Sequence, residues 1–374
     1  MANKKKVLFF MWSFSLGGGA EKILSTIVSN LDLDKYQIDI LEMEHFDKGY
    51  ETVPEGVRIL KPYKKKKYGR LVEAILWRLR IYFPYLVRKW LIKDDYDIEV
   101  SFTIMNPAFP FSKRQEVKKI AWIHGSIEAF LEENQSHYRK NHFEQLSSAD
   151  KIIAISKKTR ESIETVYPMF SDKIQTIYNG YDFTSLFEKS EEVAPVTLGK
   201  NSICVIGRLE DLKGTDRVLE VFNKLQQELP DVHLYYIGSG EQESFLKEEV
   251  EKLQLQNKVH FLGYQKNPYS ILKQAKVLLS LSKQEGFSGA VVESVTLGIP
   301  FVSTNVGGAE ELSNNGQFGE VIESDQEAIE ALKNYITGEK KISEQYSDFI
   351  QTFTIEKQLQ QVEELFQSSK EERS

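Results

Sequence analysis

The run from Glu285 to Glu293 places two carboxylates eight residues apart, on either side of a glycine-containing turn. The apolar residues 276–281 before it predict a buried strand, and residues 290–297 predict a short helix that a glycine and a proline end. One acid would follow the strand, and the other would lie in the first turns of the helix. Between them, the free amides of a helix N-terminus form a cradle for phosphate. This arrangement can hold a sugar, a diphosphate and a ribose in one line.

Two cations, Arg208 and Lys213, lie five positions apart in the loop that follows the predicted strand 202–206. An arginine fork and a lysine point charge on one strand-end loop can both reach a diphosphate. The alternative is that both are solvated surface charges, some of them paired with the neighbouring Glu210 or Asp211. This motif alone leaves both interpretations open.

These motifs need a scaffold, and strand and helix patterns alternate almost throughout the chain. The expected strands are residues 7–11, 36–42, 96–102, 119–123, 151–155, 202–206, 233–237, 259–262, 277–281 and 301–303. Such alternation predicts an α/β fold, with doubly wound parallel sheets covered by helices on both faces. Ligands of these sheets bind beyond the carboxyl ends of the strands, which is where the charged motifs fall.

The chain is expected to form two domains, because 374 residues exceed the usual size of one core. An acidic, turn-rich stretch at 188–200 interrupts the alternation and predicts a linker. The N-terminal domain would span 1–187 and the C-terminal domain 201–352. The amphipathic tail at 353–374 predicts a final helix that packs back on the N-terminal domain.

Composition narrows the class of protein. The single cysteine, Cys204, excludes a disulfide framework and favours a reducing cytoplasm. No run of about 18 apolar residues occurs, so no membrane-spanning helix is expected. The start of the chain, three lysines followed by the apolar residues 7–12, resembles a signal peptide. We expect a first β-strand there instead, because the apolar run is short and leads into a glycine-rich turn and an amphipathic helix.

In combination, these motifs resemble the family-4 retaining glycosyltransferases of the bacterial surface-polysaccharide type. That family has the GT-B fold, in which two Rossmann-like domains face a central cleft. The resemblance rests on Gly-Arg-Leu-(x)3-Lys-Gly at 207–214 and on Glu-Gly-Phe-(x)5-Glu at 285–293. Further matches lie at 16–21, 122–125, 178–182, 298–303 and 307–308. Each match is weak by itself, and the set is specific.

The resemblance implies a hexosyltransferase and assigns catalytic roles. Arg208 and Lys213 would neutralise a diphosphate as the glycosidic bond to it breaks. Glu285 would hold hydroxyls of the donor sugar, and His124 would touch that sugar near the reacting carbon. Preorganised cations beside a leaving group that gains negative charge lower the barrier directly, so we expect no metal to be required.

Donor binding follows from the same resemblance. Glu293 would bind the ribose hydroxyls of the nucleotide, for which UDP is expected. Gly18 and Gly19 would let the backbone approach the diphosphate. The remaining predicted donor contacts are Gly286, Phe287, Ser288, Gly289 and Ala290 at the sugar and distal phosphate, and Gly238, Gly263 and Tyr264 near the base.

Other chemistries are disfavoured. The pairs Asp32/Asp34 and Asp95/Asp97 resemble metal–diphosphate sites, but the first lies in a helix-to-strand turn and the second precedes a strand. Residues 17–19 lack the glycine spacing of a nicotinamide fingerprint, and no P-loop, Ser-His-Asp set or Cys-His set is readable. We therefore expect neither a cofactor nor a metal, with the nucleotide-sugar acting as a substrate.

Charge is uneven along the chain. The net charge is −7, yet residues 58–93 hold 12 Lys or Arg and one acid, a net +11 that leaves −18 on the remainder. Apolar and aromatic residues recur there at helical spacing, which predicts a basic amphipathic helix on an anionic membrane surface. The alternative is a helix whose apolar face packs on the N-terminal sheet. A nucleic-acid partner is disfavoured, because no known nucleic-acid-binding module is present.

Membrane contact suggests an acceptor that is lipid-linked or a polysaccharide, in capsular or other cell-surface glycan synthesis. The protein would then be cytoplasmic and peripheral on the inner face of the plasma membrane. Two other functions stay open. A nucleotide-sugar epimerase can share the architecture, and a non-catalytic partner subunit would bind the sugar nucleotide without transferring the sugar.

Overall fold

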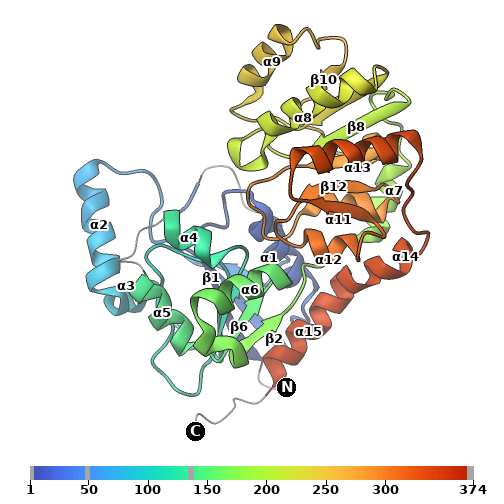
Figure 1. The fold of residues 1–374 in the computed structure, drawn as a ribbon. Coiled ribbons are helices and arrows are strands. Elements are labelled where there is room, and N and C mark those ends of the chain that lie inside the picture. Colours follow the sequence, from blue (N-terminus) through green and yellow to red (C-terminus); the bar gives the residue numbers. More distant parts are fainter. Residues whose placement is uncertain (1–3, 47–50, 134–138, 369–374) are drawn as a thin grey trace. The chain divides into compact units, whose positions relative to one another are not determined.

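The chain folds into two α/β units (Figure 1). The computed structural model describes residues 4–46, 51–133 and 139–368. The first unit runs to Gly180 and also takes the C-terminal segment from Ile355 onward, and the second unit spans Tyr181–Thr354. Each unit has its own parallel sheet with helices on both faces, which confirms the predicted doubly wound architecture.

The first unit is built on a seven-stranded parallel sheet in the order β3-β2-β1-β4-β5-β6-β7. Its strands are β1 (Lys5–Met11), β2 (Tyr36–Glu42), β3 (Arg58–Ile59), β4 (Ile98–Ser101), β5 (Lys118–Ile123), β6 (Lys151–Ala154) and β7 (Ile174–Thr176). Strand β1 lies inside the sheet, and its residue Phe9 pairs with Ile40 of β2 and Val100 of β4. All three side chains are fully buried, as the near-continuous apolar pattern of these strands requires.

Helices cover this sheet. They are α1 (Gly19–Asn30), α2 (Arg70–Tyr82), α3 (Pro84–Leu91), α4 (Ile127–Glu133), α5 (Arg139–Ser148), α6 (Lys157–Val166) and the C-terminal α15 (Ile355–Gln367). Phe366 of α15 packs its ring 6.3 Å from that of Phe9 and 5.6 Å from that of Tyr36. The buried Lys118 ammonium donates a hydrogen bond to the Ser368 carbonyl (2.8 Å) just past the end of α15. These contacts place the final helix on the first unit.

The second unit is built on a six-stranded parallel sheet in the order β10-β9-β8-β11-β12-β13. Its strands are β8 (Asn201–Ile206), β9 (Val232–Ile237), β10 (Val259–Phe261), β11 (Val277–Ser280), β12 (Phe301–Thr304) and β13 (Gly319–Ile322). The strand order changes direction between β8 and β11, because β8 continues to β9 on one side and meets β11 on the other. Such a reversal opens a crevice at the carboxyl ends of the two strands.

Eight helices belong to the described part of this unit. They are α7 (Phe183–Ser190), α8 (Thr215–Glu228), α9 (Glu243–Lys252), α10 (Tyr269–Leu272), α11 (Gly289–Thr296), α12 (Ala309–Ser313), α13 (Asp325–Thr337) and α14 (Tyr346–Phe349). Helix α8 buries Val218, Phe222 and Leu225 against the sheet, at the spacing of one helical face. This packing fixes the start of α8, and with it the loop that follows β8.

The stretch 188–200, expected as a linker, lies inside the second unit. Helix α7 includes residues 188–190, the first three residues of this stretch. The helix begins after Asp182, whose side chain accepts a hydrogen bond from the Ser185 amide (2.9 Å) and caps the helix N-terminus. The chain therefore enters the second unit at Tyr181, before this stretch.

Candidate functional site

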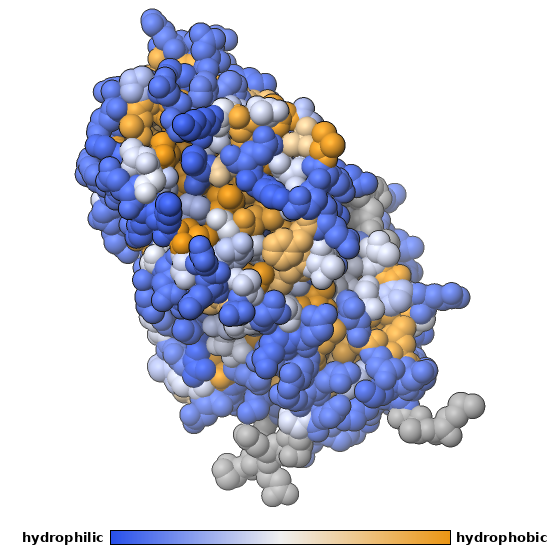
Figure 2. Space-filling model, turned by 90° about the vertical axis from the view of Figure 1, so that its right-hand side faces the viewer, coloured by the Kyte–Doolittle hydropathy of each residue, from blue (hydrophilic) through white to orange (hydrophobic). Residues whose placement is uncertain are grey.

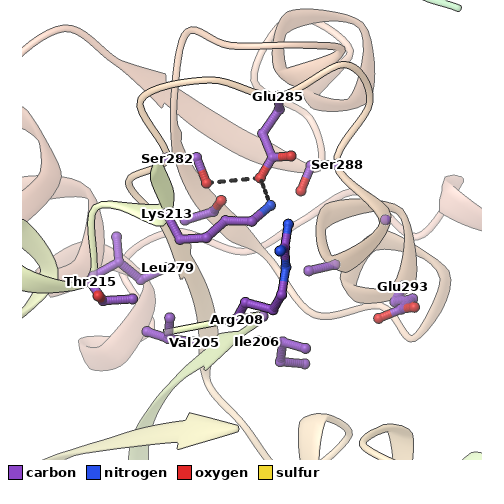
Figure 3. A pocket seen from close by; sticks show the side chains of 14 residues that line it. Val205, Ile206, Arg208, Lys213, Thr215, Leu279, Ser282, Glu285, Ser288 and Glu293 are labelled. Carbon is purple, nitrogen blue, oxygen red and sulfur yellow. Dashed lines mark hydrogen bonds and ion pairs between the residues drawn. The ribbon is translucent and has the colours of Figure 1, made fainter. Parts of the chain in front are cut away.

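A cavity of about 210 Å³ lies at the carboxyl ends of β8 and β11, where the strand order reverses. Four of the charged residues predicted from the sequence line it: Arg208, Lys213, Glu285 and Glu293. Figure 3 shows Arg208 between Lys213 and Glu293, with Glu285 above Lys213. The structure thus brings both charged motifs into one cavity, although about 70 residues of chain separate them.

The loop after β8 presents the two cations. Arg208 follows the end of the strand and keeps 76% of its side chain exposed, 3.1 Å from the Glu210 carboxylate. Lys213 ends a short 3-10 turn, and Gly214 after it adopts a left-handed conformation (φ +59°). A Cβ at Gly214 would lie 2.1 Å from the Leu281 carbonyl oxygen, so only glycine allows this loop to approach the end of β11 so closely.

Lys213 and Glu285 form an ion pair inside the cavity. The Lys213 ammonium lies 2.6 Å from Glu285 Oε1, and the Ser282 hydroxyl donates a hydrogen bond to the same oxygen (2.9 Å). Both charged side chains are largely removed from solvent, at 27% and 13% exposure. The carboxylate is therefore held at a fixed position just beyond β11, with its second oxygen directed elsewhere (Figure 3).

Helix α11 supplies the other wall. The N-cap residue Ser288 makes no capping hydrogen bond through its side chain, and Ser288, Gly289 and Ala290 line the cavity. Its first amides can therefore serve an anion in the cavity. Glu293 stands one turn further along, where the Tyr269 hydroxyl donates to its Oε1 across 3.4 Å. Burial and the neighbouring Glu293 carboxylate raise the pKa of Tyr269, so the phenol stays protonated as a donor.

The predicted site residues of the second unit therefore fall into two groups. Seven line one cavity: Arg208, Lys213, Glu285, Ser288, Gly289, Ala290 and Glu293. The others lie outside its lining: Gly286, Phe287, Gly238, Gly263 and Tyr264. Phe287 packs its ring against Phe353, and the Gly238 amide donates to the Gly263 carbonyl (2.9 Å), so these residues shape neighbouring loops. Tyr264 is 75% exposed.

In the first unit, His124 lies directly after β5. Its ring centroid is 4.7 Å from that of Phe102, and among the described residues its buried Nε2 has no hydrogen-bond partner. Burial lowers the pKa of His124 to about 3, so the imidazole is neutral at physiological pH. Gly18 is the N-cap residue of α1, and Gly19 is its first residue. The roles of these residues toward a donor remain predictions.

Sequence reasoning missed Glu42, which organises the loop between β1 and α1. Its fully buried carboxylate accepts hydrogen bonds from the Phe14 amide (2.9 Å), the Ser15 amide (3.1 Å) and the Ser15 hydroxyl (2.8 Å). His45 Nδ1 lies 2.7 Å from its other oxygen. The sequence signal for this role is an acid at the end of a buried strand. A buried carboxylate needs hydrogen-bond or ion-pair partners, because its burial is otherwise costly.

The basic segment 58–93 forms β3, α2 and α3, with a break at Phe83 and Pro84. Four of its cations are held in ion pairs or are buried. Arg58 binds Asp39 and Asp94, Lys64 binds Glu44 and Glu73, Arg88 binds Glu99, and Arg80 is buried. The net charge of +11 is therefore not all free at the surface, and eight exposed cations remain outside these contacts.

Helix α2 leaves most of its large apolar residues exposed, whereas Leu76 packs against the core of the first unit. Leu71, Ile75, Leu79 and Tyr82 recur at helical spacing and are 39–82% exposed. Leu86 and Trp90 of α3 are also exposed, at 64% and 53%, and these six residues are called the exposed apolar row. On the face shown in Figure 2, by contrast, hydrophilic side chains predominate and hydrophobic ones lie between them. The alternative, that this helix packs apolar residues on the sheet, therefore holds for Leu76 and not for the exposed residues.

The described residues contain neither a cluster of metal-binding side chains nor a membrane-spanning helix. No group of three or more His, Cys, Asp or Glu side chains in that part of the chain is arranged to hold a metal ion. Among the same residues, no helix has both the length and the apolar character needed to cross a bilayer.

Two doubly wound parallel-sheet units, one with a charged cavity at its strand-order reversal, define the GT-B class of fold. Two family models match the chain: "Glycosyltransferase Family 4" over residues 17–185 and "Glycosyl transferases group 1" over residues 187–370. The chain therefore belongs to the family-4 glycosyltransferases and is an enzyme of that class, as its motifs predicted.

Relatives agree with this assignment. An N-acetylgalactosamine-N,N'-diacetylbacillosaminyl-diphospho-undecaprenol 4-alpha-N-acetylgalactosaminyltransferase of Campylobacter jejuni is 26% identical, over 87% of this chain and 89% of that protein. An uncharacterized glycosyltransferase of Methanocaldococcus jannaschii is 29% identical; the match covers 57% of this chain and about half of that protein, 54%. The crystal structure of Anabaena HepE in complex with UDP and glucose superposes with a TM-score of 0.69 at 18% identity, covering 97% and 99% of the two chains.

Proposed function

We propose that the protein is a retaining, metal-independent hexosyltransferase that moves a sugar from a UDP-sugar to a hydroxyl of a lipid-linked or polysaccharide acceptor. The observation that carries this proposal is the shared cavity of Arg208, Lys213, Glu285 and Glu293. In the proposed reaction, its cations would face the leaving diphosphate as that group gains charge, and its acids would bind the sugar and the ribose.

The charged residues of the cavity would bind different parts of the donor. The free amides of α11 and the Arg208 guanidinium would bind the diphosphate, and Glu293, held by Tyr269, would accept hydrogen bonds from the ribose hydroxyls. When the bond from the sugar to the diphosphate breaks, its electron pair moves onto the diphosphate oxygen. The acceptor oxygen bonds to the same carbon, and the acceptor proton passes to the departing diphosphate. Lys213 would exchange part of its interaction with Glu285 for that oxygen, and Glu285 would turn to the sugar hydroxyls.

The choice of donor and acceptor rests on relatives. The Anabaena structure contains UDP and glucose, and the name of the Campylobacter enzyme describes a diphospho-undecaprenol-linked saccharide as its acceptor. We extend both classes to this chain. A lipid-linked acceptor also fits the exposed apolar row on α2 and α3, because such a substrate is confined to a membrane.

The exposed row supports membrane contact at a cytoplasmic, anionic surface. Leu71, Ile75 and Tyr82 would enter the headgroup region, and exposed cations such as Arg70, Arg78 and Lys89 flank them. Each basic residue near anionic lipid contributes about 1 kcal/mol, so eight exposed cations give ample attraction.

A transfer assay tests the proposal. Purified protein is incubated with radiolabelled UDP-sugars, singly, with and without a lipid extract that contains lipid-linked saccharides. Label that moves into the lipid phase only when both are present supports it. Conversion of the donor sugar without acceptor would instead favour an epimerase, and donor binding without any product would favour a non-catalytic subunit.

A further inference from the structure

Arg80 is the one residue of α2 that is buried, on the side opposite the exposed apolar row. It is 8% exposed, its Nη2 donates to the Pro107 carbonyl (2.6 Å), and its guanidinium lies 5.5 Å from the centre of the Trp12 ring. In the described part of the chain, no carboxylate lies within ion-pair distance of it. The acid that influences it electrostatically, Glu44, is itself paired with Lys64 at 2.5 Å.

A buried cation without an acidic partner is costly, because nothing repays the loss of its hydration. Burial accordingly lowers the pKa of Arg80 to about 10. Arg88 of the neighbouring helix α3, by contrast, is neutralised by an ion pair with the buried Glu99 carboxylate. The chain therefore retains at position 80 a charge that its own described residues do not neutralise.

Arg80 lines a cavity of about 140 Å³ between α2, α3, α5 and the loop after β4. Apolar residues, among them Ile81, Tyr85 and Phe111, form much of its wall. Asn141 and Ser148 of α5 add polar groups. Glu144 is the acid among the lining residues, and its carboxylate is 63% exposed, 3.9 Å from Lys140. Tyr85 also belongs to the exposed apolar residues, at 45%, so the cavity wall continues into that surface.

We propose that this cavity binds the phosphate group of a phosphate-bearing amphiphile, with Arg80 as the counter-charge and the exposed apolar residues of α2 and α3 against its chain. The guanidinium supplies N–H donors that match phosphate oxygens. The inference deepens the proposed acceptor and rests on it for the ligand's identity. Two sources share the chemistry: the diphosphate of a prenyl carrier and the phosphate of a membrane phospholipid.

Calorimetric titration of the full chain, without sugar nucleotide, tests the site. The probes are farnesyl diphosphate and dihexanoyl phosphatidylglycerol, each below its micelle concentration. Both are titrated into an Arg208→Ala/Lys213→Ala background, so that the cavity of the second unit does not contribute and failure of sugar transfer does not affect the result. Tighter binding of one probe identifies the source.

The variants are Arg80→Met and, as the matched control, Arg78→Met, which removes an exposed cation from the same helix. We expect Arg80→Met to weaken binding at least about tenfold, as for loss of a charge-assisted hydrogen bond, and Arg78→Met to change it by less than about threefold. Equal affinity of Arg80→Met and the parent, or no binding of either probe to the parent, would overturn the proposal.

The melting temperature of Arg80→Met distinguishes a phosphate-binding role of Arg80 from a structural role. Because Arg80 is an unpaired buried charge, Arg80→Met should melt at the same temperature as the parent or higher. A clear drop in melting temperature with retained binding would show that Arg80 serves packing and would contradict the proposal. If Arg80→Met does not fold, Asn141→Asp places a negative charge in the same wall and should weaken binding; unchanged binding then overturns it.

Discussion

Lys213 and Glu285, which lie 72 positions apart in the chain, are joined by a 2.6 Å ion pair at the centre of the charged cavity. The pair is possible because Gly214 and the end of β11 bring two strand-end loops into van der Waals contact. Each partner satisfies the charge of the other. In the proposed reaction, a diphosphate and a sugar hydroxyl would replace this contact on both sides, so the pair would hold the two side chains at the positions where the substrate needs them.

Lys213→Ala should lower turnover more than donor affinity. The ammonium acts on charge that develops as the leaving group departs, so we expect kcat to fall by about 10²-fold or more and KM for the donor to change little. Lys283→Ala is the control, since Lys283 is an exposed lysine nearby that binds Asp211. Steady-state kinetics of sugar transfer measure both. If the Lys213→Ala enzyme keeps the parental kcat, Lys213 has no catalytic role.

Glu42→Gln should loosen the loop between β1 and α1. The change keeps the shape of the side chain but removes the charge that accepts three hydrogen bonds from residues 14 and 15. We expect a loss of about 2 kcal/mol in the free energy of unfolding, the range for hydrogen bonds to a buried charged group. Urea denaturation measures it. Glu310→Gln, on the exposed end of α12, is the control and should stay within about 0.5 kcal/mol of the parent.

Stability should fall on acidification because buried histidines resist protonation. Burial lowers the pKa of His142, whose Nε2 lies 3.1 Å from the Met105 carbonyl, to about 4. The unfolded chain takes up the proton at about pH 6.5, so the folded state binds fewer protons below that pH. The stabilisation is complete above about pH 6.5 and is lost as pH falls toward 4, by roughly 1.4 kcal/mol per pH unit for this group.

Urea denaturation at about pH 7.5 and 5.5 tests this linkage. His142→Gln keeps a donor for the Met105 carbonyl and removes the titrating group, so its stability should fall less steeply than that of the parent. Parallel pH dependences for the two proteins would show that His142 does not contribute.

Replacing Lys65, Lys66 and Lys67 by Gln should weaken binding to phosphatidylglycerol vesicles. These three lysines are exposed, whereas Lys64 beside them is bound to Glu44 and Glu73 and is left intact. Loss of three charges near anionic lipid removes about 3 kcal/mol of attraction. The control replaces exposed lysines of α8 and α9, Lys224, Lys247 and Lys252, for the same change in net charge. Equal sedimentation of both variants with vesicles would refute a membrane role for the segment.

The fold and most of the charged cavity could be predicted because the relevant signals are local. A strand pattern followed by Arg208 or Glu285 fixes each residue at a strand end, and parallel strands align those ends at one edge. Glu293 follows from helical spacing in the same way.

Partners that depend on tertiary packing could not be read from the sequence. Tyr269, which donates to Glu293, and Ser282, which donates to Glu285, have no sequence motif that marks them. The net charge of 58–93 overstated the free surface charge, because the acids that neutralise Arg58 and Arg88 lie on β2, on β4 and just after α3. The pattern of α2 gave its helical spacing and an apolar face for a membrane surface, but not that Arg80 points inward.

The central claim is that one cavity binds the diphosphate and ribose of a nucleotide sugar, and calorimetric titration with UDP tests it most directly. Glu293→Ala should weaken UDP binding by about tenfold, from lost hydrogen bonds to the ribose, and Arg208→Ala by a similar factor, while Glu310→Ala should bind as the parent does. Parental UDP affinity in both cavity variants, or no UDP binding by the parent, would contradict the account.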